Sequence, residues 1–182
     1  MNIYLSKSVY RLFFLLVLLS PSFAQAHSMN FTTADWSSGF VHPMQGLDHI
    51  LAMLAVGFWA AHTPSRLWLL PLTFVSVMGL GGLAGSSGLT LPNTELIILL
   101  SGLVLSVLAV KKVSFNAKIN VLIVAFFAFF HGYAHGFELS SSADFLSYCL
   151  GFITATLLLH GAGIMTAVFI QFALKSKGRV RS

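Results

Sequence analysis

The sequence predicts an all-α fold, a polytopic membrane helix bundle of about five transmembrane helices after a cleavable signal peptide. Composition is the first observation behind this prediction. Hydrophobic residues make up 57% of the 182-residue chain and charged residues only 8%, whereas soluble domains carry about 25% charged residues. The second observation is that the apolar residues form stretches of roughly 20, the length a helix needs to cross a hydrocarbon core. The chain therefore has room for one bundle and no separate soluble domain.

Residues 1–26 have the features of a secretory signal peptide. A basic region with Lys7 and Arg11 precedes an apolar core, and the Ala-Gln-Ala sequence at 24–26 matches a small-x-small cleavage site. Cleavage there makes His27 the mature N-terminus, where its free amine and ring nitrogen are a candidate chelating pair. An uncleaved signal anchor is the alternative. In both cases the residues that follow begin outside the cytoplasm.

The remainder, residues 27–182, is predicted to be a single transmembrane helical domain. Its apolar stretches lie at about 40–61, 67–88, 94–111, 119–137 and 145–173. The last stretch is long enough to tilt or to extend past the interface. A single cysteine, Cys149, excludes an internal disulfide framework.

The charges beyond the leader are divided between the two sides of these spans. The basic residues all fall on one side: Arg66, Lys111, Lys112, Lys118, Lys175, Lys177, Arg179 and Arg181. The acidic residues Asp35, Glu95, Glu138 and Asp144 fall on the other, and only Asp48 lies within a span. The positive-inside rule makes the basic side cytoplasmic. We therefore expect a multi-pass protein of the bacterial inner (cytoplasmic) membrane with a periplasmic mature N-terminus and a cytoplasmic C-terminus. The net charge of +5 reflects this orientation, and no nucleic-acid partner is expected.

The first span contains His42, Asp48 and His49 in its outer half. Ionisable groups are costly inside a bilayer, so they usually face a protein interior or a water-filled cavity. The fourth span runs outward, which brings His131 and His135 to a similar depth, one helical turn apart on one face. These residues are therefore predicted to converge from two spans.

An unbroken helix would not bring His42 and His49 together. Seven residues of helix rise by about 10 Å, which is too far for one small ion. Pro43 and Gly46 lie between them, and both residue types disturb a helix. We expect His42 to belong to an irregular segment that folds back toward Asp48 and His49, as is tolerated where the backbone lines a cavity.

Imidazoles with a carboxylate suit nickel, cobalt, copper or zinc, and the lack of a thiolate cluster argues against copper(I) or an iron–sulfur site. The predicted metal-handling residues are His42, Asp48, His49, His131, His135 and His160. A structural polar network is the alternative for this group. His160, in the middle of the fifth span, either joins the ion path or forms a hydrogen bond across the bundle. His62, beside Thr63 and Pro64, is expected to be an interfacial residue.

The run from His42 to Gly57 resembles the signature of the HupE/UreJ family of membrane metal permeases. The segments 130–136 and 159–164 resemble the second and third motifs of that family, in the same order. The resemblance implies uptake of nickel or cobalt that serves hydrogenase or urease maturation. It implies metal handling by His42, Asp48 and His49, with His131 and His135 as partners. Members of the family usually continue into another apolar helix after a basic segment such as residues 175–181, whereas this sequence stops at Ser182. Two expectations follow: the chain is truncated, or it functions with one helix fewer as a homo-oligomer.

The function predicted from the residues and the resemblance is that of a secondary permease importing a divalent metal ion. For such a permease we expect no catalytic residues and no prosthetic group. Its expected partners are the metal ion and the lipid bilayer. A pump is disfavoured because the sequence has no phosphate-binding loop. The alternative is an intramembrane zinc-dependent hydrolase that uses the same cluster, with Asp48 as the general base. A third reading is haem held between two helices by paired histidines.

Overall fold

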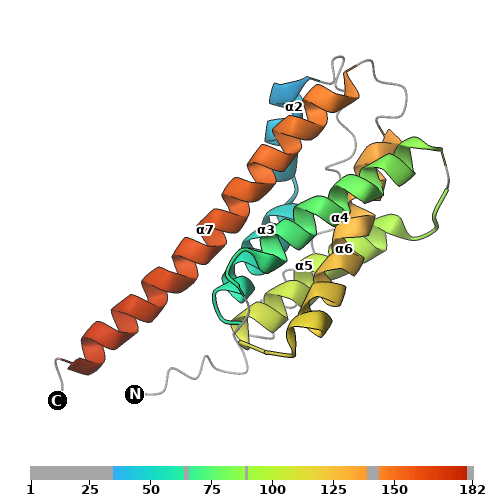
Figure 1. The fold of residues 1–182 in the computed structure, drawn as a ribbon. Coiled ribbons are helices and arrows are strands. Elements are labelled where there is room, and N and C mark those ends of the chain that lie inside the picture. Colours follow the sequence, from blue (N-terminus) through green and yellow to red (C-terminus); the bar gives the residue numbers. More distant parts are fainter. Residues whose placement is uncertain (1–34, 64–65, 89, 139–143, 180–182) are drawn as a thin grey trace. The chain divides into compact units, whose positions relative to one another are not determined.

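The computed structural model describes residues 35–63, 66–88, 90–138 and 144–179 (Figure 1). Within these ranges every regular element is a helix and none is a strand, which confirms the all-α prediction. The helices are α2 (Trp36–Gln45), α3 (Leu47–Ala60), α4 (Leu69–Ser86), α5 (Thr94–Val110), α6 (Ala117–Glu138) and α7 (Phe145–Arg179). The predicted signal peptide and His27 lie outside the described residues.

Each predicted apolar stretch corresponds to helix in the structure. By length and composition α4, α6 and α7 can each cross a membrane, whereas α3 and α5 are apolar but shorter. The predicted first span is not one helix. It is divided into α2 and α3 at Gly46, whose backbone is extended with φ −107° and ψ 126°. Pro43 lies inside α2 and cannot donate a backbone hydrogen bond, which weakens the last turn before the break.

The start of α2 is fixed by a reciprocal pair of hydrogen bonds. The Ser38 backbone N–H donates to the Asp35 carboxylate at 2.8 Å, and the Asp35 N–H donates to the Ser38 hydroxyl at 3.0 Å. This capping box satisfies two amide groups at the helix start that have no partner within the helix. The bond from the Ser38 amide, with one from the Ser37 hydroxyl, lowers the pKa of the Asp35 carboxyl.

From α3 to α7 the helices alternate in direction, as successive crossings of a bilayer require. Contacts run in the same order along α3 and α7: Gly57 lies against His160, and Ala61, just after α3, against Gln171. α4 and α6 are likewise parallel, and this pair makes the most extensive helix contact in the described chain. Figure 1 shows α7 alongside α2 and α3.

Glycines make the contact between α4 and α6 unusually close. A side chain at Gly81 would collide with the Phe129 carbonyl oxygen, and one at Gly132 with the Met78 carbonyl oxygen. Gly85 is in the same position against Tyr133. Backbones can approach this closely only where neither helix has a side chain in the way. Gly81 and Gly85, four residues apart on α4, therefore allow α4 and α6 to pack closely.

Charged residues separate to the two ends of the bundle. What we call the basic end carries the described residues Arg66, Lys111, Lys112, Lys118 and Lys175, at the ends of α5 and α7 and the starts of α4 and α6. The opposite, acidic end carries Asp35, Glu95 and Asp144 at the starts of α2, α5 and α7. All of these basic and acidic side chains are exposed or half-buried. The division predicted from the sequence is thus present in three dimensions.

Candidate metal site

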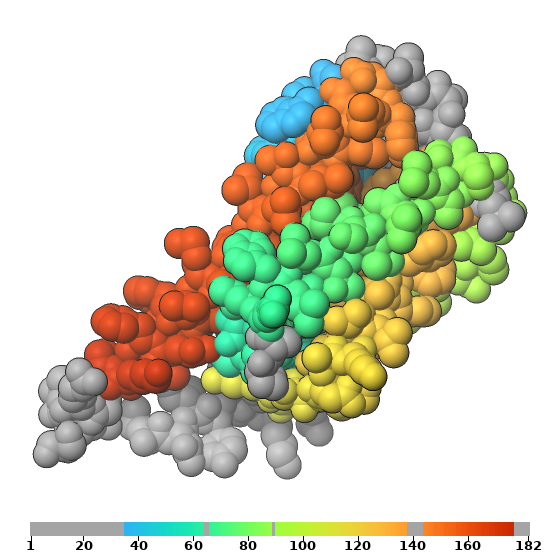
Figure 2. Space-filling model, in the orientation of Figure 1, coloured from blue at the N-terminus to red at the C-terminus, as the bar shows by residue number. Residues whose placement is uncertain are grey.

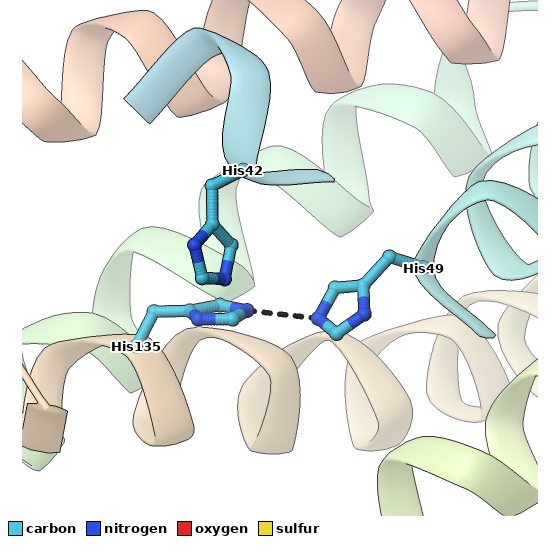
Figure 3. A group of neighbouring side chains, drawn as sticks. All are labelled: His42, His49 and His135. Carbon is cyan, nitrogen blue, oxygen red and sulfur yellow. Dashed lines mark hydrogen bonds between the residues drawn. The ribbon is translucent and has the colours of Figure 1, made fainter. Parts of the chain in front are cut away.

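Three histidines from three different helices converge near the acidic end of the bundle. His42 comes from α2, His49 from α3 and His135 from α6, and Figure 3 shows their rings turned toward one another. All three side chains are buried, with 4%, 0% and 5% of their surface exposed. One ring nitrogen from each lies within 4.8 Å of the others. We call these three residues the outer cluster.

The break at Gly46 explains how His42 and His49 come together. Because the chain turns there, the two ring centroids are 6.1 Å apart instead of being separated by about two turns of one helix. The His42 ring also packs edge-on against His135 at 4.6 Å. His42 itself lies in helix α2 and not in an irregular segment, so that part of the prediction is wrong. The interruption is at Gly46, and it brings His42 toward His49 as predicted.

Asp48 acts on the cluster through His49. One oxygen of its carboxylate, which is 16% exposed, lies 3.0 Å from His49 Nδ1 and accepts a hydrogen bond from it. In a neutral ring this places the proton on Nδ1 and leaves Nε2 as an acceptor. That Nε2 lies 3.0 Å from Nε2 of His135, which donates to it. A carboxylate that orients a histidine in this way is the usual support of a metal-binding imidazole.

His131 lies one turn deeper on α6 than His135. Its ring centroid is 5.2 Å from that of His49, so the two rings are in contact. Its Nδ1 donates to the Phe127 carbonyl oxygen at 2.9 Å, and its Nε2 lies 3.5 Å from the Ser101 hydroxyl. His131 therefore adjoins the outer cluster and is not one of the three residues whose nitrogens lie together.

The other two histidines of the described chain lie elsewhere. His160 is completely buried in the middle of α7, and its ring contacts Phe74 of α4 at a centroid distance of 5.2 Å. His62 is half-buried at the basic end, 2.9 Å from the Phe58 carbonyl oxygen. The interfacial position expected for His62 agrees with this placement.

The chain is similar to known proteins over most of its length. The profile of the family described as HupE / UreJ protein matches residues 15–181 of this chain. Protein HupE of Rhizobium leguminosarum bv. viciae is 40% identical over 151 residues, which cover 82% of this chain and 78% of that protein. The chain belongs to the HupE/UreJ family. Its apolar helices and this membership make it a membrane protein. No solved structure matches it.

The segments that resemble the HupE/UreJ motifs are those that carry the histidines. The first crosses the break between α2 and α3, the second ends α6 with His131 and His135, and the third surrounds His160 on α7. The first two meet at the outer cluster. The third is joined to them through Phe74, whose ring also contacts His131 at 5.4 Å.

Aromatic side chains around the outer cluster were not predicted as part of this HupE/UreJ site. Tyr148 and Phe152, one turn apart on α7, both pack against His42 with centroid distances of 5.9 and 5.8 Å. Phe152 also contacts His135 at 4.7 Å. Their i, i+4 spacing is a signal for a shared face, but the chain has 17 phenylalanines and such pairs are frequent in it.

An apolar pocket of about 200 Å³ adjoins the cluster between α4, α6 and α7. His135, Tyr148 and Phe152 form its inner wall, and Leu83 and Leu146, which are largely exposed, form its rim. Figure 2 shows the face on which α4 borders α7. His135 is thus the residue of the outer cluster that lines this pocket, and most of the other lining side chains are apolar or aromatic.

The donor set fits a borderline divalent ion. Neutral imidazole nitrogens bind nickel, cobalt, copper and zinc, and metal–nitrogen bonds of about 2.0–2.1 Å allow two nitrogens 3.0 Å apart to share one ion. If three imidazoles bind the ion, its remaining coordination positions are open to water or to another donor atom. The outer cluster therefore has donor atoms of the kind that such an ion binds.

Proposed function

We propose that this chain is a secondary permease that carries nickel or cobalt ions inward across the bacterial cytoplasmic membrane, for the maturation of metalloenzymes. The observation that supports it most strongly is the outer cluster. Three buried imidazoles from three helices are more polar groups than the association of membrane helices needs. Ionisable groups buried in membrane helices usually mark ion pathways. Membership of the HupE/UreJ family supports the same function.

In this proposal the ion enters from the acidic end. Exposed carboxylates at that end, including Glu95 and Asp144, attract cations electrostatically. The ion exchanges water for the nitrogens of the outer cluster. Asp48 holds His49 in the tautomer whose Nε2 faces the ion, and its negative charge offsets part of the cost of removing the cation from water.

The basic end is cytoplasmic in this proposal, by the positive-inside rule. The outer cluster, near the opposite end, then takes up ions from the periplasmic side, and an inside-negative membrane potential drives them inward. No ATP-hydrolysing part is required, because two positive charges gain about 4.6 kcal/mol from a potential of 100 mV, inside negative.

Uptake by reconstituted protein tests the proposal. The full chain in proteoliposomes with an inside-negative potential is expected to accumulate Ni²⁺ or Co²⁺, and His49→Ala is expected to abolish this accumulation. His62→Ala is the matched control, because that histidine lies at the other end of the bundle. Purified protein that retains stoichiometric zinc, hydrolyses an amide and accumulates no metal would instead show a hydrolase.

A further inference from the structure

A second group of buried polar side chains lies deeper in the bundle, on α7. Thr156 and His160 are one helical turn apart on one face, and both are completely buried. The Thr156 hydroxyl and both ring nitrogens of His160 have no hydrogen-bond partner among the described residues. Buried polar groups nearly always have a partner, and those that lack one in the protein usually bind water or an ion.

Thr156 differs in this respect from the other threonines of α7. The hydroxyls of Thr154 and Thr166 donate to the carbonyl oxygens one turn earlier, Leu150 at 2.7 Å and Ala162 at 2.8 Å. Both of these side chains are exposed, whereas Thr156 is buried. Its hydroxyl therefore remains available for another ligand, on the same face as His160.

This group lies farther from the acidic end than the outer cluster does. Phe152 of α7 contacts His42 and His135, and His160 follows it by about two helical turns, or about 12 Å along the axis. α7 runs toward the basic end, so His160 is on the cytoplasmic side of the outer cluster in the proposed orientation. α3 encloses it on one side, where Gly57 lies against the His160 backbone.

Phe74 connects the two groups. Its side chain is completely buried, and its ring contacts that of His131, next to the outer cluster, at 5.4 Å and that of His160 at 5.2 Å. An apolar ring that lies in contact with two successive polar positions is a barrier to a hydrated ion. Apolar constrictions of this kind gate channels by excluding water.

We propose that Thr156 and His160 form an inner binding position for the divalent ion, and that the Phe74 ring separates it from the outer cluster. The proposal rests on the proposed permease function and adds a second stage to it. One imidazole nitrogen and one hydroxyl, completed by water, hold the ion less firmly than three imidazoles do. Weaker binding at the inner stage favours release toward the cytoplasm, because conduction requires sites that an ion can leave.

The binding position is tested with substitutions that keep side-chain size. Thr156→Val and His160→Gln remove one donor each, and Thr154→Val and His62→Gln are matched controls. Co²⁺ is the probe, measured by equilibrium dialysis of the purified full chain and by uptake into proteoliposomes. The two test variants are expected to keep Co²⁺ binding at the outer cluster and to lose uptake by about tenfold or more, as lost ligands and their supports typically do. The controls are expected to transport normally.

Thermal stability separates the proposed binding position from a structural role, which would make the substitution destabilising. In the proposal Thr156→Val removes a hydroxyl that has no partner among the described residues, so the variant is expected to be as stable as the wild type or more stable. Uptake by both variants at the wild-type rate, while the wild type is active, overturns the inner position alone. A wild-type chain that accumulates no Co²⁺ overturns the proposed function itself, so the two failures are distinguishable.

The barrier is tested with Phe74→Leu, which keeps an apolar side chain but removes the ring. Vesicles loaded with Co²⁺ and held without a membrane potential are expected to lose it faster with this variant than with the wild type. Phe126→Leu is the control, because Phe126 is 53% exposed on the surface of α6. Equal efflux from Phe74→Leu and wild type, in protein that still binds Co²⁺, shows that the ring is not the barrier.

Discussion

The Nε2 atoms of His49 and His135 lie 3.0 Å apart although 86 residues separate the two histidines in the chain. Two nitrogens that each bind one ion at about 2.1 Å, at roughly a right angle, have this separation. Tetragonal and octahedral coordination require such an angle, and the tetragonal arrangement is typical of nickel(II) and copper(II) with nitrogen ligands. The pair is therefore placed so that one ion can replace the hydrogen bond between the rings.

The first prediction is that His49 and His135 contribute to binding as one unit. His49→Ala and His135→Ala are each expected to abolish tight Ni²⁺ binding, and the double variant is expected to bind no more weakly than either single variant. Residues that share one ligand show such non-additive energies. Isothermal titration of the purified chain measures all three, with His62→Ala as the control. Independent, additive losses would place the two histidines at separate sites.

A second prediction concerns the close contact of α4 and α6. A methyl group at Gly132 would meet the Met78 carbonyl oxygen, so Gly132→Ala is expected to force the helices apart and to destabilise the fold by about 1–3 kcal/mol. Gly161→Ala is the matched control, since a side chain there has open space around it. Thermal unfolding in detergent compares the two. Equal melting temperatures would show that the contact tolerates a side chain.

The third prediction concerns orientation. With Cys149 replaced by Ala, a single cysteine at Ser114 or Ser176, both exposed toward the basic end, is expected to react with a membrane-impermeant maleimide only after the cells are opened. A cysteine at Ser37, at the start of α2, is expected to react in intact spheroplasts. The reverse pattern would invert the bundle and the proposed direction of transport.

The fold was largely predictable because apolar length and one-sided basic charge are local properties of the sequence. The break at Gly46 was also predictable, since Pro43 and Gly46 disturb a helix wherever they occur. What periodicity could not give is the separate role of α2, which packs on α7 through contacts such as that of Gly39 with the Tyr148 carbonyl. Pairing of helices that are far apart in sequence depends on which glycine faces which backbone.

The residue types of the candidate site and its depth in the bundle were predictable from the sequence. Which of the histidines lie together in the outer cluster was not. Nothing in the spacing of His131 and His135 indicates which of them joins His42 and His49. In the structure it is His135 whose nitrogen lies with those of His42 and His49, whereas His131 Nδ1 donates to the Phe127 carbonyl oxygen. The role of Phe74 was hidden for a similar reason: only the packing of α4 brings its ring against both His131 and His160.

The fourth prediction is a loss of metal affinity in acid. An imidazole must be neutral to bind a metal and its ordinary pKa is about 6.5, so protons compete with the ion as the pH falls below about 6. The free energy of binding is therefore present at neutral pH and is lost on acidification. Titrations with Ni²⁺ between about pH 8 and pH 5 measure it. A flat affinity over this range would mean that the histidines are not ligands.

The fifth prediction isolates the charge of Asp48. Asp48→Asn keeps the shape of the side chain and leaves an amide oxygen that can still accept from His49 Nδ1, but it removes the negative charge beside the outer cluster. Losing such a partner of a metal-binding histidine typically costs about 10–100-fold in affinity or activity. Uptake of Ni²⁺ or Co²⁺ at matched expression is expected to fall by this factor.

Because the amide still orients the ring, the loss of uptake by Asp48→Asn reports the carboxylate charge that offsets desolvation of the cation. Glu95→Gln is the comparison: it removes an exposed carboxylate at the same end of the bundle, whose attraction for the cation is screened by solvent, so it is expected to lower uptake less than Asp48→Asn does. Normal transport by Asp48→Asn would show that the carboxylate is structural and that the ion does not rely on its charge.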